Sequence, residues 1–121
     1  KRNVEHLLLL VREGPSPISE QATRLLAEKA CYFGLQEIFE QLLRPCLNPM
    51  FVEDPCRPRV TRLMLSVIQE LDELVRPYTH KIMVVMEALL IEEDCTAREA
   101  AHEVISALSE ATGLANMLEK L

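Results

Sequence analysis

One stretch near the carboxyl end, residues 91–113, limits most strongly what this chain can fold into. Its apolar residues recur every three or four positions, which places them on one stripe of an α-helix. They are Ala97, Ala100, Ala101, Val104, Ile105, Leu108 and Ala111. Ala101 lies in the middle of the stripe, where small residues allow close approach of another helix. A helix of this kind cannot bury its stripe alone, so the stretch requires a partner helix and neighbours on either side.

Local signals mark the two ends of this helix. Thr96 and Glu99 have the spacing of a capping box, which predicts that the helix begins there. Gly113 can adopt the left-handed conformation that ends a helix. Asp94 and Arg98 bracket the turn into the helix. We expect both of them to be structural, with roles in the turn and in linking neighbouring units.

Five earlier segments carry the same periodicity, separated by glycine or proline. The expected helices lie at roughly 2–13, 16–33, 35–46, 58–74 and 78–91. The second is expected to be capped by Ser16 and to bury Ile18 and Leu25, and the fourth to bury Leu74. Pro45 should kink or break the end of the third helix. The three prolines within residues 48–58 predict a loop.

The fifth expected helix is apolar almost all round, which predicts burial on several sides. Its segment IMVVM has strand propensity, but the length between Pro77 and the acidic turn favours a helix. A seventh helix is expected to begin at Leu114. Because the chain starts and stops within expected helices, we interpret it as part of a longer protein.

An internal repeat organises these helices. Phe33-Gly34-Leu35 and Thr112-Gly113-Leu114 end equivalent helices that lie 79 residues apart, and a middle unit ends near Val75. Two periods of about 40 residues, each a helix pair, are typical of HEAT repeats. The predicted fold is therefore all-α, a HEAT-repeat α-solenoid. Its three helix pairs are expected at residues 1–34, 35–75 and 76–113, with the start of a fourth at 114–121.

The composition argues against several classes of function. The net charge is −6, so the chain has no global electrostatic footprint for nucleic acid. The sequence shows no nucleophile elbow, phosphate loop, HExxH motif or paired catalytic acids, so we expect no enzyme activity and no cofactor. The four cysteines form no C-x-x-C pair and predict idle thiols in a reducing compartment, not a metal site. The longest apolar run, residues 82–91, is too short to cross a membrane.

Two basic clusters are candidate partner contacts. Arg76, Tyr78, His80 and Lys81 lie at an expected corner between helices and are candidates for contact with phosphate or an acidic protein. In the alternative interpretation the two cations are solvated and the tyrosine packs the corner.

The second cluster consists of Arg57, Arg59 and Arg62, at the start of an expected helix. Cations are unfavourable at a helix start because the helix dipole is positive there. This conflict favours the interpretation that the cluster binds a partner.

The segment LDELVRPYTHKIMVVMEALLIEEDCTAR, residues 71–98, resembles the first HEAT repeats of the splicing factor 3b subunit 1 family. The resemblance continues through VISALSEATGLANM at 104–117 and extends more weakly to the start of the chain. The loop at 48–58 is longer and richer in proline than the family pattern. The resemblance implies a nuclear, non-enzymatic scaffold of the U2 snRNP. Such a scaffold clamps the duplex of U2 snRNA with the intron branch site and binds other subunits of the splicing factor 3b complex.

Two other functions compete with this one. The first is a HEAT-repeat adaptor of another kind, such as a transport or phosphatase scaffold, and the second is a regulatory domain of an enzyme. Fold alone does not separate them. For the scaffold that the resemblance implies, we expect protein contacts to dominate. RNA, including U2 snRNA or intron RNA, should bind this segment only weakly, because few phosphates can be neutralised.

Overall fold

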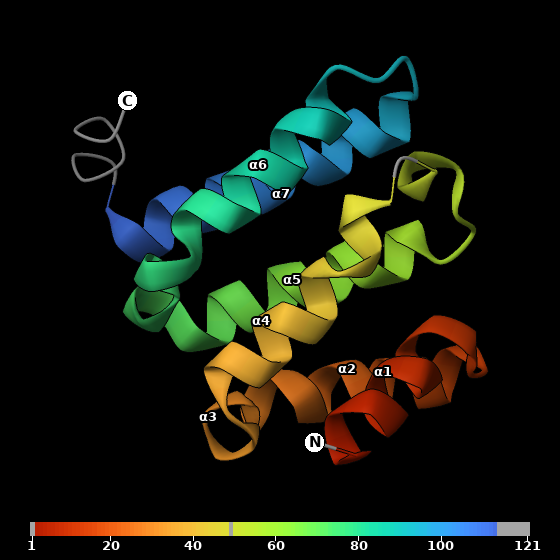
Figure 1. Cartoon of the computed structure of the whole chain (residues 1–121), viewed down its shortest axis with the longest axis vertical. Helices are drawn as coiled ribbons and strands as arrows, with labels where there is room; N and C mark the ends of the chain where they lie inside the picture. Colours follow the sequence, from red (N-terminus) through yellow and green to blue (C-terminus); the bar gives the residue numbers. More distant parts are fainter. Residues whose placement is uncertain (1, 49, 114–121) are drawn as a thin grey trace.

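The computed structural model describes residues 2–48 and 50–113, which form helices joined by short turns (Figure 1). No strand occurs among these residues, which confirms the all-α prediction. The α-helices are α1 (Arg2–Glu13), α2 (Ser16–Glu28), α3 (Ala30–Phe33), α4 (Leu35–Leu43), α5 (Arg57–Leu71), α6 (Thr79–Leu90) and α7 (Cys95–Thr112). Three 3-10 segments join them, at η1 (Pro45–Leu47), η2 (Phe51–Glu53) and η3 (Asp72–Tyr78). The seventh helix expected from Leu114 lies outside the described residues.

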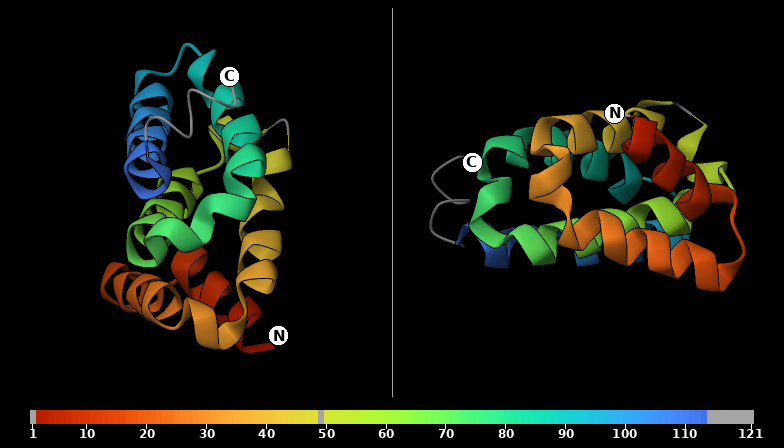
Figure 2. Two further views of the ribbon diagram at one scale, coloured as in Figure 1. Left: turned by 90° about the vertical axis from the view of Figure 1, so that its left-hand side faces the viewer. Right: turned by 90° about the horizontal axis from the view of Figure 1, so that it is seen from below.

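The helices form two layers (Figure 2). One layer contains α2, α5 and α7, which pack directly on one another in chain order. The other contains α1, α4 and α6; α1 packs on α2, and α6 packs on α7. This arrangement of helix pairs side by side fits the predicted solenoid, in which each pair covers the apolar stripe of the next.

The α7 stripe is buried as its spacing predicts. Ala97, Ala101 and Leu108 are fully shielded from solvent and Val104 nearly so. Ala100 and Ile105, at the edges of the stripe, are only half-buried. Because α7 packs against α5, α6 and η3 together, its small residues face helices on more than one side.

The start of α7 differs from the prediction. Asp94, not Thr96, is the N-cap residue: its carboxylate accepts hydrogen bonds from the backbone N–H groups of Thr96 and Ala97. The Thr96 hydroxyl donates to the same carboxylate at 2.6 Å, so it supports the cap and does not provide it. The end is as expected, since Gly113 has φ 85° at the end of the helix.

The second helix also departs from its prediction. Pro15 is the N-cap residue of α2, and Ser16 is its first helical residue and makes no capping hydrogen bond. The buried face consists of Ser19, Ala22, Thr23, Leu26 and Ala27. Ile18 and Leu25 are therefore 43% and 41% exposed.

Hydroxyl groups explain this shift of the buried face. The Ser19 hydroxyl donates to the Val11 carbonyl at 2.7 Å, and the Thr23 hydroxyl donates to the Ser19 carbonyl at 2.9 Å. Both residues can therefore be buried without losing a hydrogen bond. After Lys29 the short α3 follows, and Gly34, at φ 101°, ends it.

Each helix of the middle pair, α4 and α5, ends at a break in the helical pattern. Pro45 ends α4, as predicted, and a 3-10 turn replaces its last residues. The helix expected at 58–74 instead ends at Leu71, because Asp72 takes φ 52° and turns the chain into η3. As a result Val75 is fully buried while Leu74 is 51% exposed.

The fifth expected helix forms as α6, but only one of its faces is buried among the described residues. Ile82 and Met86 are fully buried, whereas Val84 is 48% exposed. The prediction of burial on several sides is therefore wrong for this part of the chain. The exposed side of α6 faces the groove described below.

Candidate partner-binding surface

The first arginine of the second basic cluster is part of the fold. Arg57 is 6% exposed. Its guanidinium donates to the Asp94 carboxylate at 3.1 Å and to the Thr96 hydroxyl at 3.0 Å. It therefore joins the start of α5 to the start of α7 and is not part of the candidate surface.

The other two arginines of that cluster point to α1 and α2. The Arg59 guanidinium donates to the carbonyls of Val11 and Gly14, at the end of α1. Helix ends of that kind carry carbonyls without helical partners and the negative end of the dipole, so a cation is favourable there. Arg62 is exposed and lies 4.0 Å from Glu20 of α2.

These contacts remove the apparent conflict of three cations at a helix start. Arg57 and Arg59 are held by oxygen atoms of neighbouring helices, so the local dipole does not decide their positions. Of the cluster, only Arg62 keeps an exposed side chain that can reach another molecule.

The turn before α7 is closed by its own side chains. The pKa of Asp94 is lowered to about 2, first by the Thr96 hydroxyl and then by the Arg57 guanidinium and the backbone N–H of Thr96. Arg98 donates to the Glu92 carbonyl at 2.7 Å. Asp94 thus serves both as a helix cap and as the acceptor for an arginine of the preceding helix pair.

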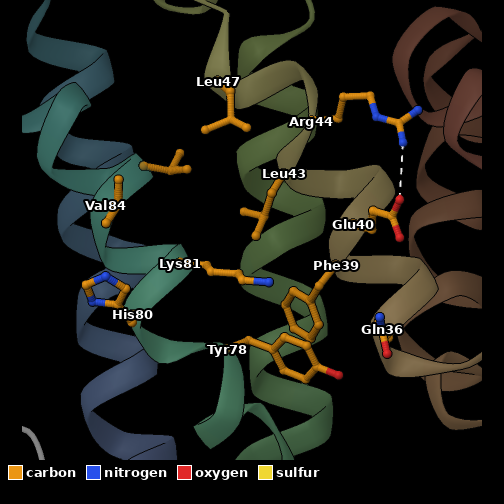
Figure 3. Close-up of a pocket in the computed structure, with 11 residues that line it drawn as sticks. Gln36, Phe39, Glu40, Leu43, Arg44, Leu47, Tyr78, His80, Lys81 and Val84 are labelled. Carbon is orange, nitrogen blue, oxygen red and sulfur yellow. Dashed lines mark hydrogen bonds and ion pairs between the residues drawn. The ribbon is translucent and has the colours of Figure 1, made fainter.

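The first basic cluster lies beside a groove between α4 and α6, with a volume of about 560 Å³ (Figure 3). Its lower end is formed by Phe39 of α4 and Tyr78 of η3, whose rings stack with centroids 4.4 Å apart. The α4 side also contributes Gln36, Glu40, Leu43 and Arg44, followed by Leu47 of η1. The α6 side contributes His80, Lys81, Val84 and Val85.

The structure brings three of the four predicted residues of this cluster together. Tyr78, His80 and Lys81 all line the groove, whereas Arg76 is exposed on η3 and is not part of the lining. In the alternative interpretation, Tyr78 packs the corner between helices. Its ring does so, since it stacks on the ring of Phe39.

The α4 side of the groove was missed by the sequence analysis. Phe39 and Leu43 are buried in the core and also form part of the groove lining. The available signal was the spacing of Gln36, Glu40 and Arg44, which places these polar residues in one row along the buried stripe. Nothing in the sequence shows that this row faces α6.

The charges around the groove are unevenly satisfied. Arg44 and Glu40 form an ion pair at 3.4 Å on α4, with both side chains more than half exposed. Such surface pairs stabilise a protein little. Figure 3 shows Lys81 extending from α6 across the groove toward α4. Among the described residues, no carboxylate lies within ion-pair distance of Lys81.

Other kinds of site find no support in the described part of the chain. No group of metal-ligating side chains is present there, and the four cysteines are unpaired. Burial raises the pKa of the Cys46 thiol to about 12, so it stays protonated at neutral pH. None of the described helices is long and apolar enough to span a bilayer.

Comparison with known proteins shows a relationship along nearly the whole chain. The chain is 42% identical to "U2 snRNP component prp10" of Schizosaccharomyces pombe, over 118 residues or 98% of its length. It is 36% identical over the same share to "U2 snRNP component HSH155" of Saccharomyces cerevisiae. This chain is homologous to a segment of these U2 snRNP components. No protein-family model matches it.

Prp10 and HSH155 are the yeast orthologues of splicing factor 3b subunit 1, so the resemblance noted in the sequence is confirmed. The chain spans only 10% of prp10 and 12% of HSH155. It corresponds to a small part of such a protein, and the groove between α4 and α6 is a feature of that part.

Proposed function

We propose that this chain is a scaffold segment of a pre-mRNA splicing factor, acting in the nucleus as part of the U2 snRNP. The observation that carries the proposal is the identity to two U2 snRNP components over 98% of the chain. Because the chain spans about a tenth of those proteins, its share of their function is that of a segment. We assign it no catalytic step.

The proposed role of the segment is to hold other subunits of the splicing factor 3b complex and the U2 snRNP. A layered helical array exposes long surfaces without needing an enclosed site, which suits protein contacts. The candidate contact residues are Arg62, Arg76, Tyr78, His80 and Lys81. The groove between α4 and α6 supports this role because it combines exposed apolar groups with a cation.

RNA contacts are the smaller part of the proposal. U2 snRNA or intron RNA would meet a chain of net charge −6, in which Arg57 and Arg59 are already held by neighbouring helices. Non-specific affinity for nucleic acid depends on how many phosphates are neutralised. A transport or phosphatase scaffold is not favoured, since the curated relatives are splicing components.

The test is to purify the natural protein that carries these residues and to quantify the RNA that accompanies it. We expect strong enrichment of U2 snRNA over U1 snRNA and over an unrelated nucleolar RNA, and intron retention after depletion of the protein. Enrichment of a transport factor or a phosphatase subunit in place of U2 snRNA would contradict the proposal.

A further inference from the structure

The groove between α4 and α6 has apolar walls that the described part of the chain does not cover. Leu47 at its upper end is 69% exposed and Val84 on its α6 side is 48% exposed, while Phe39 and Leu43 form its buried side (Figure 3). Exposed apolar groups that cluster in a concave site mark contact surfaces more often than single exposed residues do.

Helices α4 and α6 flank the groove on its two sides (Figure 3). The lining residues on the α4 side, from Gln36 of α4 to Leu47 of η1, recur at spacings of three and four, and those of α6 do so from Lys81 to Val85. Figure 3 shows both rows rising from the stacked pair of Phe39 and Tyr78 toward Leu47. A volume of about 560 Å³ accommodates several side chains of a bound segment.

The charges select what can enter. Lys81 reaches across the groove and His80 lies beside it, whereas Arg44 is already engaged by Glu40. A carboxylate from a partner can pair with Lys81 above the apolar floor, where partial exclusion of water strengthens the interaction. The chain as a whole has a net charge of −6, so an acidic segment is favoured only where a cation is exposed, and Lys81 provides one beside an apolar surface.

We propose that the groove between α4 and α6 binds a short amphipathic helix of a partner protein, with leucine-like anchors over Leu43, Leu47 and Val84 and an acidic residue paired with Lys81. The proposal deepens the scaffold function proposed above and rests on it for its biological setting.

An RNA strand fits the same groove less well. Its phosphates require several cations along the path, whereas the lining offers one lysine, one histidine and an arginine that is paired with Glu40. The apolar side chains of Leu47 and Val84 have no partner in a phosphate backbone. Protein is therefore the occupant that uses the whole lining.

The test uses the natural full-length protein, stripped of its partners by a high-salt wash. The probe is a fluorescent, stapled helical peptide of about four turns, with leucines at i, i+3, i+4 and i+7 and glutamates on the flanks. Binding is followed by anisotropy, and a benzophenone in the peptide maps the contacted residues by mass spectrometry. Two control peptides replace the leucines by alanine or the glutamates by lysine.

Matched protein variants separate the groove from general surface effects. Lys81→Glu and Val84→Glu alter the groove. Lys29→Glu makes the same charge change at an exposed site outside it, and Ile18→Glu makes the same apolar-to-acidic change at a side chain that is 43% exposed. Circular dichroism of all four variants checks that each keeps the parent fold.

We expect cross-links to residues 36–47 or 78–85 and a loss of affinity of about tenfold or more with either groove variant. The Lys29 and Ile18 variants and the parent should agree within about twofold. No binding of the acidic peptide, equal binding of the basic peptide, or cross-links outside the groove would overturn the proposal. So would a single-stranded RNA that displaces the peptide and loses affinity with Lys81→Glu but not with Val84→Glu. Enrichment of U2 snRNA is measured independently, so either proposal can fail alone.

Discussion

At the scale of single residues, Asp94 makes several structural contacts although its side chain is partly exposed. It caps α7 through two backbone N–H groups and receives the guanidinium of Arg57 from α5. Arg57 can be buried at the start of a helix because this carboxylate and the Thr96 hydroxyl satisfy it. One side chain thus sets the start of a helix and its position against the preceding pair.

This arrangement predicts a dependence of stability on pH. The pKa of Asp94 lies near 2 in the folded chain, below its ordinary value of 3.8. A lowered folded pKa means that the stabilisation is fully present above the unfolded value and is lost as pH falls toward the folded one. Urea unfolding of the parent and of Asp94→Asn should therefore differ most above about pH 5 and converge as the pH falls toward 2. A difference that stays constant across this range would contradict the assignment.

Ala101 provides a second prediction at this scale. It is fully buried in the middle of the α7 stripe. Ala101→Asp would place a carboxylate among apolar side chains without a partner, which costs several kcal/mol, out of the roughly 5–15 kcal/mol of a typical domain. We expect the variant to be unfolded or strongly destabilised in thermal melts. The matched control is Ala88→Asp on exposed α6 surface, which should lose far less. Equal melting temperatures for the two variants would show that Ala101 is not buried.

At the scale of elements, the break between α5 and α6 decides where the groove opens. Asp72 ends α5 with φ 52° and ψ −122°, a conformation that strongly favours glycine. The following 3-10 segment brings Val75 into the core and places Tyr78 on Phe39. The position of α6 relative to α4 therefore depends on a turn at one residue.

This turn predicts that Asp72→Gly stabilises the chain. Strain at a non-glycine residue destabilises the folded chain by about 1–3 kcal/mol, and glycine removes that strain. Glycine also gives the unfolded chain more conformational freedom, which lowers the stability of the folded chain by about 0.5–1 kcal/mol. The net gain should be about 1 kcal/mol in chemical denaturation. Glu73→Gly is the control: its φ is not positive, so it should lose about 0.5–1 kcal/mol. Destabilisation by both substitutions to a similar extent would argue against strain at Asp72.

At the scale of the whole molecule, the two layers are unequal. Helices α2, α5 and α7 pack continuously, whereas α4 and α6 leave a groove between them. In the second basic cluster, Arg57 links α5 to the start of α7 and Arg59 links α5 to the end of α1, so neither guanidinium is free for nucleic acid. We therefore expect the contacts that join neighbouring helices to lower the affinity of this segment for RNA.

The corresponding prediction concerns RNA affinity. Residues 1–121 alone should bind a duplex like that of the branch site with micromolar or weaker affinity, and added salt should abolish the binding. The measurement is a salt titration by fluorescence anisotropy, with a scrambled duplex as the control for sequence preference. Submicromolar, sequence-selective binding at physiological salt would refute this prediction.

The sequence by itself determined the helical class, most helix positions and the family relationship. These follow from local rules: the spacing of Ala97, Ala101 and Leu108, the break at Pro45 and the glycines at 34 and 113 act within a few residues of chain. The α7 stripe was predicted correctly because a small-residue stripe leaves one face that can be buried.

Only the tertiary structure decided which side chains share a surface. The hydroxyls of Ser19 and Thr23 donate to backbone carbonyls, so their face of α2 can be buried while Ile18 and Leu25 stay exposed. A pattern of hydrophobic residues contains no information about such hydrogen bonds. Arg57 became structural because Asp94, 37 residues away in the chain, lies beside it. Lys81 lies opposite α4 through the turn at Asp72 and the packing of η3 and α6 on α7. Contacts between elements depend on distances across the fold, and residue periodicity along one helix carries no information about them.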